Sequence, residues 1–118
     1  MSDKYLVNCE YGANHPEKAT IAFILAFTSS KTNETAVFAT ADASHLFVRD
    51  HRPDIVADGY EPLNGLIDGF IDNGGKVWLC PACAKAKGIA ADDLIDGVEI
   101  AGAPKTMAYL AAGARLLA

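Results

Sequence analysis

The stretch KVWLCPACAKAKG, residues 76–88, joins a short apolar run to a Cys-Pro-Ala-Cys motif and ends in a glycine. The β-branched and aromatic residues of KVWLC favour a buried strand over 76–80. Proline suits the first position of a helix, and glycine is common just after a helix end. The stretch therefore predicts a strand that ends at Cys80, which is also the N-cap of a short helix closed by Gly88.

The flanking sequence continues this alternation of strand and helix in both directions. Apolar runs bounded by turn residues predict strands over 4–9, 32–40, 98–102 and 114–118. Apolar residues at helical spacing predict helices over 16–29, 63–71 and 103–113. Nearly continuous apolar strands that alternate with helices indicate an α/β sandwich around a mainly parallel sheet.

The sequence between the second strand and the second long helix is irregular. Asp42 is expected to cap a short helix that runs to Val48. Residues 45–60 then read as a long polar loop that contains His45 and His51. Loops of this length in small domains are usually functional or mobile, and we expect both histidines to be solvated.

Size and composition limit the classes of function. With 118 residues, about half of them apolar, the chain is expected to form one domain over 1–118. A net charge of −5 argues against nucleic acid as a partner. The longest apolar stretch, ATIAFILAF, is too short to span a bilayer, and no signal peptide is visible. We expect a cytoplasmic protein with free thiols, without membrane contact, cofactor or metal.

The cysteines are the residues most suited to chemistry. Reaction sites in parallel α/β sheets gather at the carboxyl ends of the strands. Cys9 and Cys80 each end a predicted strand, so both are expected along this edge, although the sequence does not specify the strand order. The free N–H groups and the positive dipole end of the helix after Cys80 favour its thiolate. Cys83 lies one turn further along, so Cys80 is the better candidate nucleophile.

The residues alone leave other interpretations of the Cys-x-x-Cys pair open. A strand followed by this motif at a helix start is also the arrangement of thioredoxin-like dithiol proteins. A zinc site would need further ligands from separate loops, drawn from Cys9, His15, His45 and His51. The pair could also be small core residues without reactivity. His15 directly precedes Pro16 at a predicted helix start, where a capping role is expected rather than catalysis.

Two segments carry a family resemblance. KVWLCPACAKAKGI followed by DLIDGVEIAG resembles the DsrE/DsrF-like family of small α/β proteins, and within it the YchN-like branch with a Cys-x-x-Cys motif. The opening KYLVNCEYGANHPEKATIAFILA is similar to the first strand, glycine-containing loop and first helix of that family. The resemblance covers nearly the whole chain. It implies a five-stranded parallel sheet in a three-layer α/β/α sandwich, and assembly into homotrimers or homohexamers.

The resemblance also implies a function. In the sulfur-relay members a cysteine at the end of the third or fourth strand carries a persulfide and passes it to a partner protein. That cysteine matches Cys80, and Cys83 matches the second cysteine of the YchN-like branch. The hypothesis is a sulfur carrier with Cys80 as nucleophile and Cys83 as resolving thiol, which exchanges sulfur with donor and acceptor proteins. Cys9 and His15 are secondary candidates. The alternatives are a noncatalytic oligomeric ligand-binding or assembly module, and a dithiol redox protein.

Overall fold

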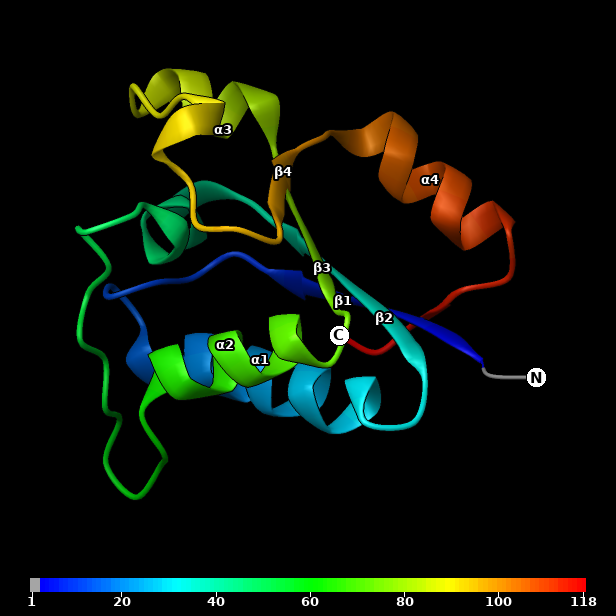
Figure 1. Ribbon diagram of the computed structural model, residues 1–118, viewed down its shortest axis with the longest axis horizontal. Coiled ribbons are helices and arrows are strands. Elements are labelled where there is room, and N and C mark those ends of the chain that lie inside the picture. The colour runs from blue at the N-terminus through cyan, green and yellow to red at the C-terminus, as the bar shows by residue number, and fades with distance from the viewer. Residues whose placement is uncertain (1–2) are drawn as a thin grey trace.

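The computed structural model describes residues 3–118 and shows a five-stranded sheet with helices on both faces (Figure 1). The strands are β1 Lys4–Cys9, β2 Glu34–Ala39, β3 Lys76–Leu79, β4 Val98–Ile100 and β5 Arg115–Leu116. The α-helices are α1 Pro16–Ser30, α2 Leu63–Asp72, α3 Pro81–Ala86 and α4 Ala103–Ala111. Two 3-10 helices, η1 Ala41–Phe47 and η2 Ala91–Asp93, complete the set in the described residues. The expected three-layer α/β sandwich is confirmed.

The strand order sets the positions of the helices. All paired strands are parallel, in the order β4-β3-β2-β1-β5. Each connection from β1 to β4 leads to the neighbouring strand. The last connection differs, because α4 leads from β4 at one edge of the sheet back to β5 at the other edge. Figure 1 shows α4 on the opposite face of the sheet from α1 and α2.

Most of the hydrophobic core lies between the sheet and the helices α1 and α2. Phe23 of α1 is fully buried and contacts Phe47 of η1 and Phe70 of α2, with ring centroids 6.0 Å apart in both pairs. The other face has a smaller cluster of buried residues, Leu6, Ala36 and Trp78, beneath α4. Successive side chains of a strand point to opposite faces of the sheet, so the same strands contribute residues to both clusters.

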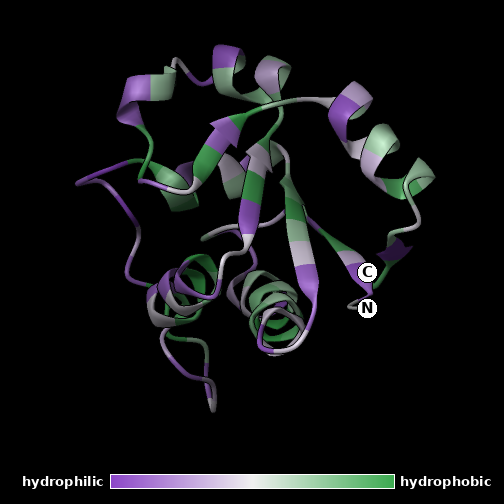
Figure 2. Cartoon of the chain, turned by 45° about the vertical axis from the view of Figure 1, so that its right-hand side comes forward, coloured by the Kyte–Doolittle hydropathy of each residue, from purple (hydrophilic) through white to green (hydrophobic). Residues whose placement is uncertain are grey.

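The irregular segment between η1 and α2 is anchored at several points. The Arg52 guanidinium donates a hydrogen bond to the Leu46 carbonyl over 3.3 Å and pairs with Asp68 at 2.9 Å. The Tyr60 hydroxyl lies 3.2 Å from a carboxylate oxygen of Glu17 in α1. Figure 2 shows this segment as largely hydrophilic, whereas hydrophobic residues gather on the strands and on α1 and α2. These contacts hold the loop against the body of the protein.

The expected capping role of Asp42 is wrong. The N-cap of η1 is Thr40, which makes no side-chain capping hydrogen bond. The helix begins earlier than expected because Ala41 takes a left-handed conformation, with φ of 51°, directly after β2. Asp42 therefore lies inside the first turn, where its carboxylate is free to make contacts outside the helix.

Within residues 3–118, no helix is both long enough and apolar enough to cross a bilayer. The cytoplasmic location stays a prediction.

Candidate functional site

Cys80 lies at the carboxyl end of β3, an inner strand of the sheet. Its backbone N–H donates to the Ala39 carbonyl at the end of β2 over 2.9 Å, so the sheet holds the backbone of Cys80 in place. The strand ends one residue earlier than expected, at Leu79, and Cys80 is the N-cap of α3 with Pro81 in the first turn. The predicted N-cap position is therefore confirmed. The Cys80 residue is partly exposed and its thiol is free.

Several groups act on the ionisation of Cys80. Partial burial raises the pKa of its thiol, whereas the backbone N–H and side chain of Cys83 and the backbone N–H of Ala82 lower the pKa. The net effect is a pKa below the ordinary value for cysteine. Cys80 makes no side-chain capping hydrogen bond in α3, so the lowered pKa reflects the two nearby backbone N–H groups and the Cys83 side chain together. The surroundings of Cys80 thus favour a nucleophilic thiolate.

Cys83 is directed toward the loop that follows β2. The backbone N–H of Ala41 donates a hydrogen bond to the Cys83 sulfur over 3.2 Å. This donor belongs to the residue with φ of 51°, so the unusual backbone there turns an N–H group toward α3. The sequence contained no signal for this contact, because it joins residues 42 positions apart.

Polar side chains connect the loops around the two cysteines. Lys87, which follows α3, lies 3.9 Å from one Asp42 carboxylate oxygen, and the Asn14 amide donates to the other over 3.1 Å. Asn14 also accepts a hydrogen bond from the Gly12 backbone N–H over 3.0 Å. The loops that follow β1, β2 and β3 are thereby joined at one edge of the sheet. The sequence pattern contained no signal for the pairing of Lys87 with Asp42, because these residues belong to separate loops.

Gly12 allows two of these loops to approach closely. A Cβ atom at this position would lie 2.5 Å from the Asp42 carbonyl oxygen, which is backbone and cannot move aside alone. We expect Gly12→Ala to lower the free energy of unfolding by about 1–3 kcal/mol, because the added methyl overpacks the site. It should also displace Ala41 and expose Cys83, measured as faster alkylation of Cys83.

Gly65 in α2 provides the matched control for this prediction. A Cβ atom there would meet nothing within 4 Å. Gly65→Ala should therefore leave the protein as stable or make it slightly more stable, because alanine favours the helix. Equal effects of the two substitutions in urea denaturation would contradict the close approach at Gly12.

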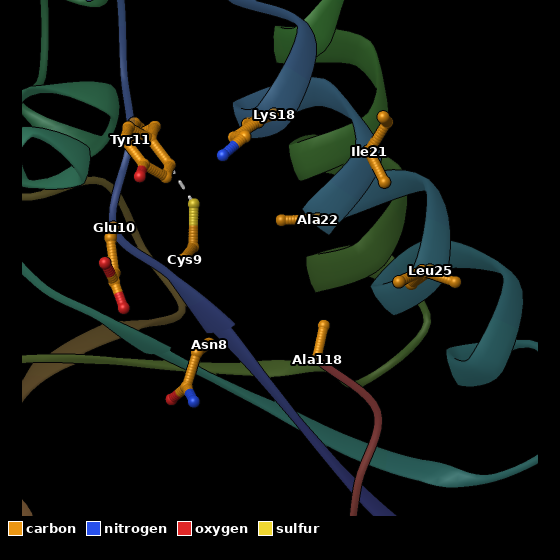
Figure 3. Close-up of a pocket in the computed structure, with 9 residues that line it drawn as sticks. All are labelled: Asn8, Cys9, Glu10, Tyr11, Lys18, Ile21, Ala22, Leu25 and Ala118. Carbon is orange, nitrogen blue, oxygen red and sulfur yellow. Dashed lines mark hydrogen bonds between the residues drawn. The ribbon is translucent and has the colours of Figure 1, made fainter. Parts of the chain in front are cut away.

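Cys9 lies away from Cys80 and cannot act with it directly. The register aligns Cys9 with Ala39 and Ala39 with Leu79, so β2 separates the two cysteine-bearing strands. The backbones of β1 and β3 are therefore two strand spacings, or about 10 Å, apart. The Cys9 side chain instead packs in the core on the α1 side of the sheet, and its thiol donates to the Tyr11 carbonyl in the loop after β1 over 3.6 Å (Figure 3). The expected shared edge is correct, but the two thiols do not form one site.

The surroundings of Cys9 suppress its reactivity. Burial raises the pKa of this thiol to about 12, although the hydrogen bond to Tyr11 opposes the increase. Cys9 borders a cavity of about 350 Å³ between β1, α1 and Ala118. Figure 3 shows Lys18, Ile21 and Leu25 of α1 along this cavity. The neutral, buried thiol is part of the core rather than a nucleophile.

The histidines do not join the cysteines. His15 is the N-cap of α1, and its Nδ1 accepts a hydrogen bond from the Lys18 backbone N–H over 3.4 Å, which confirms the capping role. His45 lies in η1 and His51 in the following loop, and both are exposed. Within residues 3–118 no three His, Cys, Asp or Glu side chains gather closely enough to hold a metal ion. The ligand set considered for zinc is thus not assembled.

The fold and the site together define a class of protein: a parallel α/β sandwich with an activated thiol where a central strand passes into a short helix. A sequence model of the DsrE/DsrF-like family matches residues 3–118, and the chain belongs to this family. The resemblance seen in the sequence is confirmed. The family is associated with sulfur relay.

Two archaeal proteins are similar in sequence. The chain is 27% identical over 111 residues to protein MJ0760 of Methanocaldococcus jannaschii, which covers 93% of this chain and 40% of MJ0760. It is 33% identical over 86 residues to protein MK0008 of Methanopyrus kandleri, which covers 72% of this chain and 68% of MK0008. The chain thus spans less than half the length of MJ0760.

Two solved structures share the fold. The ychN protein from E. coli matches with a TM-score of 0.78 at 20% identity, covering 99% of this chain and 100% of that one. MTH1491 from Methanobacterium thermoautotrophicum matches with a TM-score of 0.70 at 14% identity, covering 98% of both chains. At these identities the likeness shows the fold alone.

Proposed function

We propose that this protein is a sulfur carrier in which Cys80 accepts a sulfane sulfur from a donor protein and passes it to an acceptor protein. The observation that carries the proposal is the position of Cys80: a partly exposed thiol held at the end of β3 and the start of α3, with Cys83 one turn later. Membership of a family associated with sulfur relay supports it.

The proposed chemistry consists of two thiol exchange steps. The Cys80 thiolate attacks the outer sulfur of a donor persulfide; the donor S–S bond breaks, and the donor leaves as a thiolate. An acceptor thiolate then attacks the outer sulfur of the Cys80 persulfide, and Cys80 leaves as a thiolate. No net oxidation or reduction occurs in this exchange. Both steps benefit from a low thiol pKa, which increases the thiolate population and improves the leaving group.

Cys83 offers a second route for the bound sulfur. Its thiolate can attack the inner sulfur of the Cys80 persulfide, which forms a Cys80–Cys83 disulfide and releases hydrosulfide. The sulfane sulfur is reduced in this step and the two thiols are oxidised, so a separate dithiol reductant must restore the protein. The N–H of Ala41 on the Cys83 sulfur supports this role, because the contact holds the Cys83 side chain in place one turn after Cys80.

Mass spectrometry of the intact protein tests the sulfur-carrier proposal. After incubation with inorganic polysulfide, the wild-type chain should gain the mass of one sulfur atom, and peptide mapping should place that sulfur on Cys80. Cys80→Ser should abolish the gain, whereas Cys9→Ala should retain it. Cys83→Ser should retain the added sulfur longer, because the route to hydrosulfide is removed. Absence of added sulfur in both the wild type and Cys83→Ser, or equal loading of Cys80→Ser, would exclude the proposal.

The same experiment separates a dithiol redox protein from a sulfur carrier. The proximity of the Cys83 side chain, which contributes to the lowered pKa of Cys80, favours this second candidate. A redox protein would lose the mass of two hydrogen atoms on oxidation and would gain no sulfur.

We also propose that the protein forms homotrimers or homohexamers. Ile21 and Leu25 of α1 are 40% and 37% exposed, and Leu117 beside them is 39% exposed. Leu25 and Leu117 border the same surface hollow, so the apolar residues are contiguous. A contiguous apolar surface of this kind is typical of a subunit contact. Sedimentation velocity measures the oligomeric state directly.

A further inference from the structure

The loop that follows β2 meets Cys83 through an unusual backbone conformation. Ala41 has a φ of 51°, and the only other non-glycine residue with a positive φ in residues 3–118 is Asp50, at 67°. Residues other than glycine are uncommon in this left-handed region, because the Cβ atom crowds the backbone. Such a conformation persists only where the surroundings hold it, so the contacts of Ala41 require an explanation.

Hydrogen bonds hold the backbone of Ala41 on both sides. The Thr40 N–H donates to the Cys9 carbonyl over 3.0 Å, and the hydroxyl of the buried Ser44 donates to the Ala41 carbonyl over 2.7 Å. The Ala41 N–H donates to the Cys83 sulfur over 3.2 Å, which is its only acceptor in the part of the chain that the structure describes. Ala41 is itself exposed, so packing of its methyl group contributes little. The contact with Cys83 therefore joins the conformation of Ala41 to the cysteine pair.

Formation of a Cys80–Cys83 disulfide would change this contact. A covalent S–S bond is far shorter than the contact between two separate thiols, so the sulfurs must approach each other. The backbone of Cys80 is held by its N–H on the Ala39 carbonyl, at 2.9 Å, so the Cys83 side chain supplies part of the movement. Ala41 belongs to another loop and does not follow it. We expect the contact to be present in the dithiol and lost in the disulfide.

The conformation of Ala41 also places Asp42 between two neighbouring loops. The Asp42 carboxylate lies 3.9 Å from the Lys87 amine and accepts a hydrogen bond from the Asn14 amide over 3.1 Å. Gly12 packs closely against the Asp42 carbonyl oxygen, which a Cβ atom at this position would approach to 2.5 Å. A change at Ala41 therefore displaces the groups that connect the loops after β1, β2 and β3.

We propose that Ala41 is a positioning residue whose left-handed conformation favours the dithiol form of the Cys80–Cys83 pair. The N–H that this conformation presents to Cys83 stabilises the dithiol, and formation of the disulfide releases residues 40–42. This role rests on the proposed function, in which the two cysteines form the reacting pair. A disfavoured disulfide is readily reduced, so the protein returns to the form that can accept sulfur.

Equilibration with glutathione measures the preference of the pair. Oxidised glutathione reacts with one protein thiol to give a mixed disulfide and one glutathione thiol. The second protein thiol attacks the protein sulfur of the mixed disulfide, which forms the Cys80–Cys83 bond and releases the second glutathione thiol. The protein pair loses two electrons and oxidised glutathione gains them. Mass spectrometry after alkylation of the free thiols gives the ratio of dithiol to disulfide at each ratio of reduced to oxidised glutathione.

Ala41→Gly tests the role with the smallest change in structure. Glycine adopts the left-handed conformation without steric cost, so the equilibrium should shift toward the dithiol by about two- to ten-fold. Ala41→Val should shift it toward the disulfide, because a branched side chain opposes that conformation. An equilibrium in Ala41→Gly equal to that of the wild type would overturn the proposal, as would a wild-type pair that forms no disulfide at any glutathione ratio.

Asp50→Gly is the matched control. Asp50 is also exposed and left-handed, but within residues 3–118 no hydrogen bond joins it to either cysteine of the pair. The substitution should leave the glutathione equilibrium unchanged. A shift equal to that of Ala41→Gly would assign the effect to the stability of the whole fold and would overturn the role of Ala41.

Amide hydrogen exchange of Ala41, followed by NMR, provides a second readout. Exchange should be slow in the dithiol and faster both in the disulfide and in Cys83→Ala, where the acceptor is absent. Equal exchange in the dithiol and the disulfide would overturn the proposal. A chain that takes up no sulfur from polysulfide but shows these changes would exclude the sulfur carrier and support the role of Ala41. Sulfur uptake on Cys80 without these changes would overturn the role of Ala41 alone.

Discussion

Iodoacetamide is expected to alkylate Cys80 about a thousand-fold faster than Cys9, or more, in the folded protein at neutral pH. The pKa of Cys80 is below its ordinary value, whereas burial raises that of Cys9 to about 12. Alkylation requires the thiolate, and three pKa units correspond to a thousand-fold difference in thiolate population below both pKa values. Peptide mapping of samples quenched at intervals gives a separate rate for each cysteine.

The pH dependence of Cys80 alkylation should differ between the folded protein and the protein in urea. A lowered pKa increases the thiolate fraction at every pH below it, so the rate for Cys80 should reach its plateau at a lower pH in the folded protein than in urea. Cys9 should react only when the protein unfolds, and its rate in urea should match that of an ordinary thiol. A folded-state midpoint for Cys80 at or above the value in urea would show that the thiol is not activated.

Phe23→Ala is expected to lower the free energy of unfolding by about 3–5 kcal/mol. Phe23 is fully buried between Phe47 and Phe70, with 6.0 Å between ring centroids on either side. Removal of the ring leaves a cavity where α1, α2 and η1 meet, and the two neighbouring rings belong to different elements that cannot both close in. Urea denaturation at a fixed protein concentration measures the loss.

Val56→Ala is the control for this prediction. Val56 is 58% exposed in the loop before α2, so its truncation should change the free energy of unfolding by no more than about 0.5 kcal/mol. A loss below about 1 kcal/mol for Phe23→Ala would mean that the packing around its ring is looser than the structure shows.

Local sequence determined the setting of Cys80. Pro81 follows it at the one helical position where proline is favoured, and the apolar run before it can form only a buried strand. The same holds for His15, whose place before Pro16 predicted its capping role. These features depend on residues a few positions apart, so a sequence pattern contains the information for them.

The strand order could not be predicted from such patterns, and it decided which thiols act together. β2 lies between β1 and β3, so Cys9 is kept in the core beside α1, while Cys83, one turn after Cys80, receives the N–H of Ala41 from the loop after β2. Asp42 does not cap η1 because the helix begins one residue earlier, at Ala41, and its carboxylate instead contacts Asn14 and Lys87 from two other loops.

The sequence by itself determined that this protein is a parallel α/β sandwich with a cysteine at the start of a short helix. Only the tertiary structure decided that Cys83 receives the N–H of Ala41 and that Cys9 is inert. Helix caps and strand patterns follow from neighbouring residues. Contacts across 40 or more residues depend instead on how whole elements pack, because many segments compete to cover the same apolar surface.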